Sequence, residues 1–219
     1  MRWLVLFLSL CLCSPLVRAA SSEENSVTAS ALIREMNIAR QNPGLYASYI
    51  EELRAHFDGR NLILPGGTRL RTKEGTRALD EAIRFLRGAQ PQAPLVLSHG
   101  MCRAAADHCA DQVGGRMGHD GSDHSNPAVR ISRYGQWGGG WAENIAYGKT
   151  NARDIIMALI IDDGLPARKH RKNIFNSRYN VAGAAFGSHA RFRTVCSIDF
   201  AGAFAERDQT GGALVARNF

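Results

Sequence analysis

The chain has 219 residues, which suits one domain together with a processed leader. Hydrophobic residues make up 45% of it and charged residues 21%, an ordinary composition for a globular protein. A domain of about 200 residues buries roughly 70% of its unfolded surface, so the fold does not depend on a disulfide scaffold. The formal net charge of +7 is mild and spread along the chain, and we find no pattern typical of a nucleic-acid-binding module.

The N-terminus has the pattern of a secretory signal peptide. Arg2 precedes an apolar run from Trp3 to Cys13, and the residues before position 20 resemble a small-residue cleavage site. We expect cleavage after Ala19, giving a leader of residues 1–19, with Ala20 as the second choice. The apolar run is too short to span a bilayer, which needs about 20 residues. We therefore expect a secreted or periplasmic mature protein without a membrane span, whose net charge is +5 once residues 1–20 are removed, because that leaves 25 Lys and Arg against 20 acids.

Apolar residues recur at helical spacing in the first half of the mature chain. Three amphipathic helices are predicted, in "TASALIREMNIARQNP", "PGLYASYIEELRAHF" and "KEGTRALDEAIRFLRGA". Asn42 and Pro43 end the first helix, and Pro43 suits the first turn of the second. The intervening residues 59–72 contain "PGG" and basic residues and are predicted to be a loop.

The second half continues with helices and ends in strands. "PLVL" is predicted to be extended, Ser98 to cap a helix, Asn126 and Pro127 to open a short one, and Asn151 to cap a third that is apolar on almost every side. A glycine run at 138–140 is expected to interrupt the chain. "NVAGAAFGSHARFRTVCSIDFAG" predicts an antiparallel hairpin that turns at 187–190. Helices that precede a late sheet favour an α+β domain over residues 27–204, followed by a tail at 205–219.

Two acids stand at an unfavourable place. The apolar helix that begins after Asn151 ends at Asp162 and Asp163, and a carboxylate at the negative end of a helix costs roughly 0.3–1 kcal/mol unless it is paired. The cations Arg168, Lys169, Arg171 and Lys172 lie close enough in sequence to pair with them.

The mature chain keeps three cysteines, Cys102, Cys109 and Cys196. Cys102 and Cys109 fall on one predicted helix, about 10.5 Å apart along its axis, which is beyond the reach of a disulfide. Cys196 could bridge to either of them, and a Cys102–Cys196 disulfide is our first choice. Three free thiols are an equally good reading of the sequence.

Three polar islands carry the residues suited to chemistry: "GHDGSDHSNP", "WAENIAYG" and "DDGLPARKHRKNIF". They supply His119, Glu143 and His170, and we expect folding to bring these three to one cleft, joined by Asp162 or Asp163. His56, His99, His108 and His189 are interpreted as structural or surface residues. The sequence contains no H-E-x-x-H pair and no G-x-S-x-G turn. It therefore has neither a zinc-binding motif nor the motif that marks a serine nucleophile.

The three islands and the residues around them resemble the CAP superfamily, also called the SCP domain. The resemblance is carried by "WAENIAYG", "GHDGSDHSNPAVRISRYG", "KHRKNIFNSRYNVAGAAFG" and "VCSIDFAGAF". The superfamily includes the cysteine-rich secretory proteins, antigen 5 and pathogenesis-related class 1 proteins. The resemblance covers residues 29–204. It implies a three-layer α-β-α sandwich with a central antiparallel sheet and a cleft formed by His119, Glu143, His170 and one of Asp162 and Asp163.

The resemblance also implies what the cleft binds. In the family, two histidines hold a divalent cation, often zinc, and here these would be His119 and His170; lipids, other small molecules and protein partners are also associated with the fold. This chain departs from the family pattern where Ala142 and Lys169 replace glycines. We therefore expect a non-enzymatic secreted protein that binds a cation, a small molecule or a lipid. The alternative is a metal-assisted hydrolase, a peptidase or esterase, that uses Glu143 in the same cleft.

Overall fold

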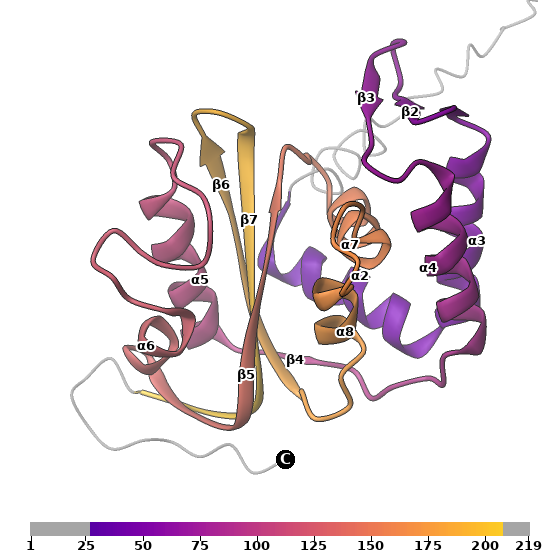
Figure 1. The fold of residues 1–219 in the computed structure, drawn as a ribbon. Helices are drawn as coiled ribbons and strands as arrows, with labels where there is room; N and C mark the ends of the chain where they lie inside the picture. The colour runs from indigo at the N-terminus through magenta and orange to yellow at the C-terminus, as the bar shows by residue number, and fades with distance from the viewer. Residues whose placement is uncertain (1–26, 208–219) are drawn as a thin grey trace, which may run out of the picture.

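A four-stranded sheet lies between two layers of helices (Figure 1) in the computed structural model, which describes residues 27–207. The protein is therefore an α+β three-layer sandwich, as the sequence predicted. The predicted signal peptide and residues 208–219 of the predicted tail lie outside the described residues. The helices are α2 (Ala29–Gln41), α3 (Pro43–Arg54), α4 (Thr76–Gly88), α5 (His99–Asp111), α6 (Pro127–Ser132), α7 (Ala152–Ile161) and α8 (Lys169–Ile174).

The main sheet has the strand order β4-β6-β7-β5. Its strands β6 (Val181–His189) and β7 (Arg193–Glu206) form the predicted antiparallel hairpin, and β5 (Gly135–Tyr147) pairs antiparallel with the other side of β7. The short β4 (Val96–Leu97) runs parallel to β6 at the edge. Strand β7 continues to Glu206, two residues past the predicted end of the domain.

Side-chain caps place the helices where the sequence predicted them. Ser98, Asn126 and Asn151 each accept a hydrogen bond from a backbone N–H in the first turn of the following helix, at 3.1, 3.0 and 2.8 Å. These bonds satisfy donors that a helix leaves free at its N-terminus, which fixes the first residue of α5, α6 and α7. Pro43 occupies the start of α3, as expected.

Alternation along β7 divides the core in two. Ile198 and Phe200 face the layer that contains α2, α3, α4 and α7, whereas Val195 and Ala201 face α5. All four side chains are fully buried. Because successive side chains of a strand point to opposite faces, a sheet covered on both sides has apolar residues at consecutive positions. This explains why the predicted hairpin is mostly apolar, with Ser197 and Asp199 as buried polar exceptions on β7.

Three local predictions were wrong. Residues 59–72 are not a plain loop: they contribute to a small antiparallel sheet of β1 (Phe57–Asp58), β2 (Asn61–Ile63) and β3 (Arg69–Arg71). The glycines at 138–140 do not interrupt the chain but form a bulge inside β5, with Gly139 and Gly140 at positive φ. The hairpin turns at residues 190–192, because Gly187 and Ser188 pair with Val195 and Thr194.

The disulfide prediction was also wrong, since Cys102, Cys109 and Cys196 are all free. Cys196 points into the core that contains α2 and α7, whereas Cys109 lies on α5 and packs against the opposite face of the sheet. Cys102 lies on the same helix and its sulfur accepts a hydrogen bond from Ala184 N. The sheet therefore separates Cys196 from both cysteines that it was predicted to reach.

Candidate functional site

The first side of the site is built on β5. Its Glu143 has a side chain that is only 1% exposed, and the Oε1 atom lies 2.7 Å from Nδ1 of His119. His119 follows Gly118, which adopts a φ of 102° that favours glycine, and its imidazole is 53% exposed. A carboxylate oxygen only accepts hydrogen bonds, so Nδ1 of His119 donates this one, and in the neutral tautomer the lone pair is then on Nε2.

Both carboxylate oxygens of Glu143 accept hydrogen bonds. The Oε2 atom accepts a hydrogen bond from Arg130 Nη2 at 2.7 Å and another from Ser197 Oγ at 3.1 Å. Burial acts to raise the pKa of Glu143, but the hydrogen bond from His119 and the charges of His108 and Arg130 outweigh it, so the pKa lies below its usual value. Glu143 is thus a fixed, buried carboxylate that orients His119.

The second side has the same arrangement on different elements. Asp162 ends α7 and is 1% exposed; its Oδ1 atom lies 2.7 Å from His170 Nδ1, and its Oδ2 atom accepts a hydrogen bond from His170 N at 3.0 Å. These contacts with His170 pair the Asp162 carboxylate, which lies at the unfavourable C-terminal end of a helix. Asp163 turns away and accepts hydrogen bonds from the backbone N–H groups of Lys73 and Glu74, at 2.7 and 2.8 Å. Of the two acids left open by the sequence, the structure pairs Asp162 with His170.

The expected cation partners of these acids are occupied elsewhere. Arg171 donates to the carbonyls of Ile160 and Ile161 at 2.6 and 3.2 Å, so it neutralises the negative end of α7 directly. The Arg168 guanidinium contacts the backbone carbonyl of Asp162 rather than its carboxylate. The predicted pairing of the two carboxylates with Arg168, Lys169, Arg171 and Lys172 was therefore wrong, and Asp162 pairs with His170 instead.

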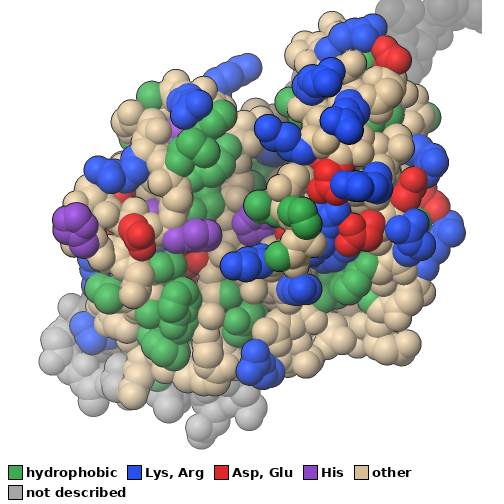
Figure 2. Space-filling model, viewed as in Figure 1, with side chains coloured by type: hydrophobic (Ala, Val, Ile, Leu, Met, Phe, Trp, Pro, Cys, Tyr) green, Lys and Arg blue, Asp and Glu red, His purple; other side chains and the backbone are tan. Residues whose placement is uncertain are grey.

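His119, Glu143 and His170 line one cavity of about 310 Å³. Figure 2 shows histidine side chains gathered across the middle of the molecular face on which β5 and α8 are seen in Figure 1. An amide pair joins the two sides: Asn144 donates to the His170 carbonyl at 3.0 Å and accepts from Asn173 Nδ2 at 2.8 Å. The other residues that line the cavity are Leu165, Pro166, Ala167, Lys169 and Asn173.

Sequence reasoning missed the residues behind Glu143. His108 was interpreted as structural; it is fully buried, lies 3.8 Å from Glu143 Oε1, and has a pKa lowered by burial. Asp199 pairs with Glu143 across β5 and β7 and is fully buried, with neither carboxylate oxygen hydrogen-bonded. Burial and the nearby Glu143 raise the pKa of Asp199 well above its usual value. The proximity of Asp199 to Glu143 follows from the pairing register of β5 and β7, which the sequence did not predict.

The donor set limits what the site can hold. Across residues 27–207, no group of three or more His, Cys, Asp or Glu residues is arranged to hold a metal ion. A cation in the cleft would therefore contact the Nε2 atoms of His119 and His170 and take its other ligands from water or from a bound molecule. Within the same residues, no helix is both long and apolar enough to cross a membrane.

Comparison with known proteins places the chain in a family. Solved structures that resemble it include an extracellular SCP-domain protein from Bacillus anthracis str. Ames (18% identity, TM-score 0.41, 57% of this chain and 39% of that one). Others are an outer surface protein from Borrelia burgdorferi (15%, 0.42, 74% and 93%) and a cysteine-rich secretory protein from Staphylococcus aureus subsp. aureus Mu50 (14%, 0.37, 62% and 41%). No curated protein matches the chain. The family model of the cysteine-rich secretory proteins matches residues 75–200, more than half of the sequence, and the chain belongs to this CAP family.

Proposed function

We propose that the protein is a secreted, non-enzymatic binding protein whose cleft holds a divalent cation, zinc being the first to test, between His119 and His170. One observation carries the proposal: each imidazole has its Nδ1 atom 2.7 Å from a buried carboxylate, Glu143 for His119 and Asp162 for His170. Metal-binding histidines in proteins commonly have this partner, because it fixes the tautomer and makes the other nitrogen more basic. Both imidazoles line the same cavity, together with Glu143.

The rest of the cleft supports binding of a further molecule. Zinc would supply a Lewis-acidic centre with coordination positions left for oxygen or nitrogen ligands. Leu165, Pro166 and Ala167 form an apolar wall, which favours a small ligand with a polar end. Lys169 also lines the cleft, and its charge opposes a second cation while favouring an anionic group.

The state of Glu143 argues against the hydrolase alternative. A general base needs a free oxygen within reach of the proton that it removes and a pKa near the working pH. Glu143 has both oxygens engaged, by His119, Arg130 and Ser197, and its pKa is lowered. We therefore favour binding over catalysis.

Isothermal titration of the full chain with zinc tests the proposal. His119→Ala and His170→Ala should each abolish measurable binding, and Glu143→Gln or Asp162→Asn should weaken it about 10–100-fold, the usual cost of losing the partner of a metal-binding histidine. His99→Ala is the matched control, since His99 is exposed and does not line the cleft. Equal affinity in His119→Ala, His170→Ala and the unaltered protein would refute the site.

A second binding function has its own cavity. A space of about 600 Å³ lies among β1–β3, α3, α4 and α7, and we propose that it takes the apolar chain of an anionic amphiphile, whose head would meet Arg71, Lys73 and Lys149. Its volume falls within the range of small-molecule sites, and its walls are mostly apolar. The apolar residues that line it are Leu53, Phe57, Leu62, Leu70, Leu79, Ala158, Ile161 and Phe192.

Native mass spectrometry with palmitate tests this second site. Leu70→Glu should remove the palmitate adduct, because it places a carboxylate at a wall residue that is 40% exposed. Val96→Glu is the matched control, since Val96 is 44% exposed and lies on β4, outside the cavity. Palmitate binding that is equal in both variants would exclude this cavity.

A further inference from the structure

We infer that Arg168 is a positioning residue for the His170 side of the cleft, and that Glu74 and Glu81 hold Arg168 in place. The inference rests on the proposed cation site, because it assigns residues that set the geometry of one of the two imidazoles. None of these three side chains lines the cleft.

The loop that leads from α7 to α8, the helix that carries His170, has a left-handed residue at each end. Asp162, at the end of α7, has a φ of 57°, and Arg168, just before α8, has a φ of 49°. The left-handed region is unfavourable for residues with a side chain, least so for asparagine and aspartate, and an arginine stays there only where the surrounding structure holds it. Between these two residues lie Leu165 and its neighbours up to residue 167, which form the apolar wall of the cleft. The wall and His170 therefore depend on contacts that keep both strained residues in place.

The Arg168 side chain supplies those contacts. It is 6% exposed, and its Nη1 atom donates to the carbonyl of Asp162 at 2.7 Å and to that of Leu165 at 3.3 Å. Asp162 is the residue that orients His170 through its carboxylate. One guanidinium thus fixes both the partner of the imidazole and a residue of the cleft wall.

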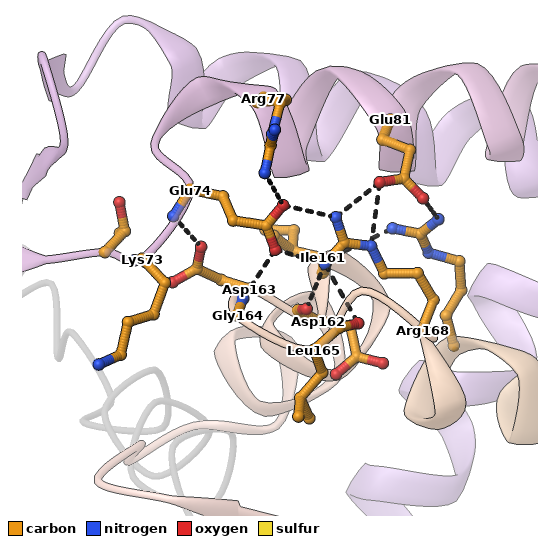
Figure 3. Close-up of polar contacts among 12 residues, drawn as sticks. Lys73, Glu74, Arg77, Glu81, Ile161, Asp162, Asp163, Gly164, Leu165 and Arg168 are labelled. Atoms are coloured by element: carbon orange, nitrogen blue, oxygen red, sulfur yellow. Dashed lines mark hydrogen bonds and ion pairs between the residues drawn. The ribbon is translucent and has the colours of Figure 1, made fainter.

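Two acids from another part of the chain hold the guanidinium, as Figure 3 shows. Glu74 accepts from Nη1 and Nη2 of Arg168 at 2.7 and 2.9 Å, and Glu81, on α4, accepts from Nε and Nη2 at 3.0 and 2.6 Å. Glu74 also accepts a hydrogen bond from Gly164 N at 2.9 Å, inside the strained loop. The hydrogen bond from Arg168 is the main reason that the pKa of Glu74 is lowered to about 2, so this contact remains ionised at any ordinary pH.

The other side of the cleft has independent support. His119 is oriented by Glu143, which is held by Arg130 and Ser197 on α6 and β7. Neither Arg168 nor its acidic partners contact these residues by any hydrogen bond or ion pair recorded among residues 27–207. Loss of the Arg168 contacts should therefore disturb His170 and leave His119 unchanged.

The test is Arg168→Asn in the full chain, because asparagine tolerates the left-handed backbone but lacks the guanidinium. The nitrogen NMR signals of the His170 ring in metal-free protein should lose the pattern of a single Nδ1–H tautomer, while those of His119 stay as they are. Zinc affinity should fall about 10–100-fold. Arg77→Ala is the matched control: Arg77 also binds Glu74, but it is 77% exposed and does not reach the loop, so both ring patterns should persist.

Unchanged His170 signals in Arg168→Asn would overturn the inference, and so would equal changes in both rings, since these would mean general loosening. If Arg168→Asn does not fold, Glu81→Gln must produce the same selective change in His170; it weakens one of the two anchors of Arg168 and also the 3.3 Å contact of Glu81 with Arg171. The ring signals are read without metal. A protein that binds no zinc would therefore refute the proposed cation site and still leave the role of Arg168 decided by NMR.

Discussion

Replacing Asp199 by asparagine should change how the stability of the protein depends on pH. Asp199 is fully buried, and burial with the nearby Glu143 raises its pKa well above its usual value. Between the unfolded pKa, near 3.9, and the raised folded pKa, the folded state binds more protons than the unfolded state. Stability attributable to Asp199 is thus fully present below pH 4 and is lost as the pH rises, by up to about 1.4 kcal/mol per pH unit.

Asparagine has the size of the protonated acid and cannot ionise, so Asp199→Asn should remove this loss. Urea unfolding at pH 4.5, 5.5, 6.5 and 7.5 measures the effect as the difference in unfolding free energy between the two proteins. The variant should gain on the unaltered protein as the pH rises, by up to about 1.4 kcal/mol per unit until the folded pKa is passed. A difference that stays constant across this range would show that Asp199 titrates normally and would refute the reasoning.

Two further predictions concern the core. Arg40→Met should destabilise the protein by about 3–5 kcal/mol in urea unfolding. Arg40 is fully buried and donates only to backbone carbonyls, among them those of Ala93 and Ile174, and these would lose a charged donor. A loss of unfolding free energy below about 1 kcal/mol would contradict this prediction. Mass spectrometry of the mature protein after alkylation in urea without reductant should find Cys102, Cys109 and Cys196 all modified. Native alkylation of Cys109 should be very slow, since burial raises its pKa to about 12. A disulfide-linked peptide that contains any of the three would contradict the structure.

Local signals in the sequence determined most of the helices. A capping residue such as Ser98 or Asn151 acts on the backbone within its own first turn, so its effect can be read without knowing the fold. The apolar character of α7 likewise follows from the sequence and predicts burial on most sides. The three polar islands could be singled out because glycines, acids and histidines interrupt apolar sequence there.

Contacts between remote segments were decided only by the tertiary structure. The choice between Asp162 and Asp163 depends on the left-handed backbone of Asp162, which turns its carboxylate toward His170 and leaves Asp163 to bind the backbone at Lys73. The failure of the disulfide prediction has the same origin, since alternation along β7 places Cys196 on the face away from α5.

The acids behind and beside the cleft depend on still longer-range contacts. Asp199 meets Glu143 through the register of β5 and β7, and Glu74 meets Arg168 although 94 positions separate them in the chain. Composition and spacing carry no information about such pairs, because their energy comes from burial and from charges that meet only in the folded protein. The sequence by itself therefore identified His119, Glu143 and His170, and the folded structure alone chose Asp162 over Asp163 and assigned Arg168 and its two acidic partners.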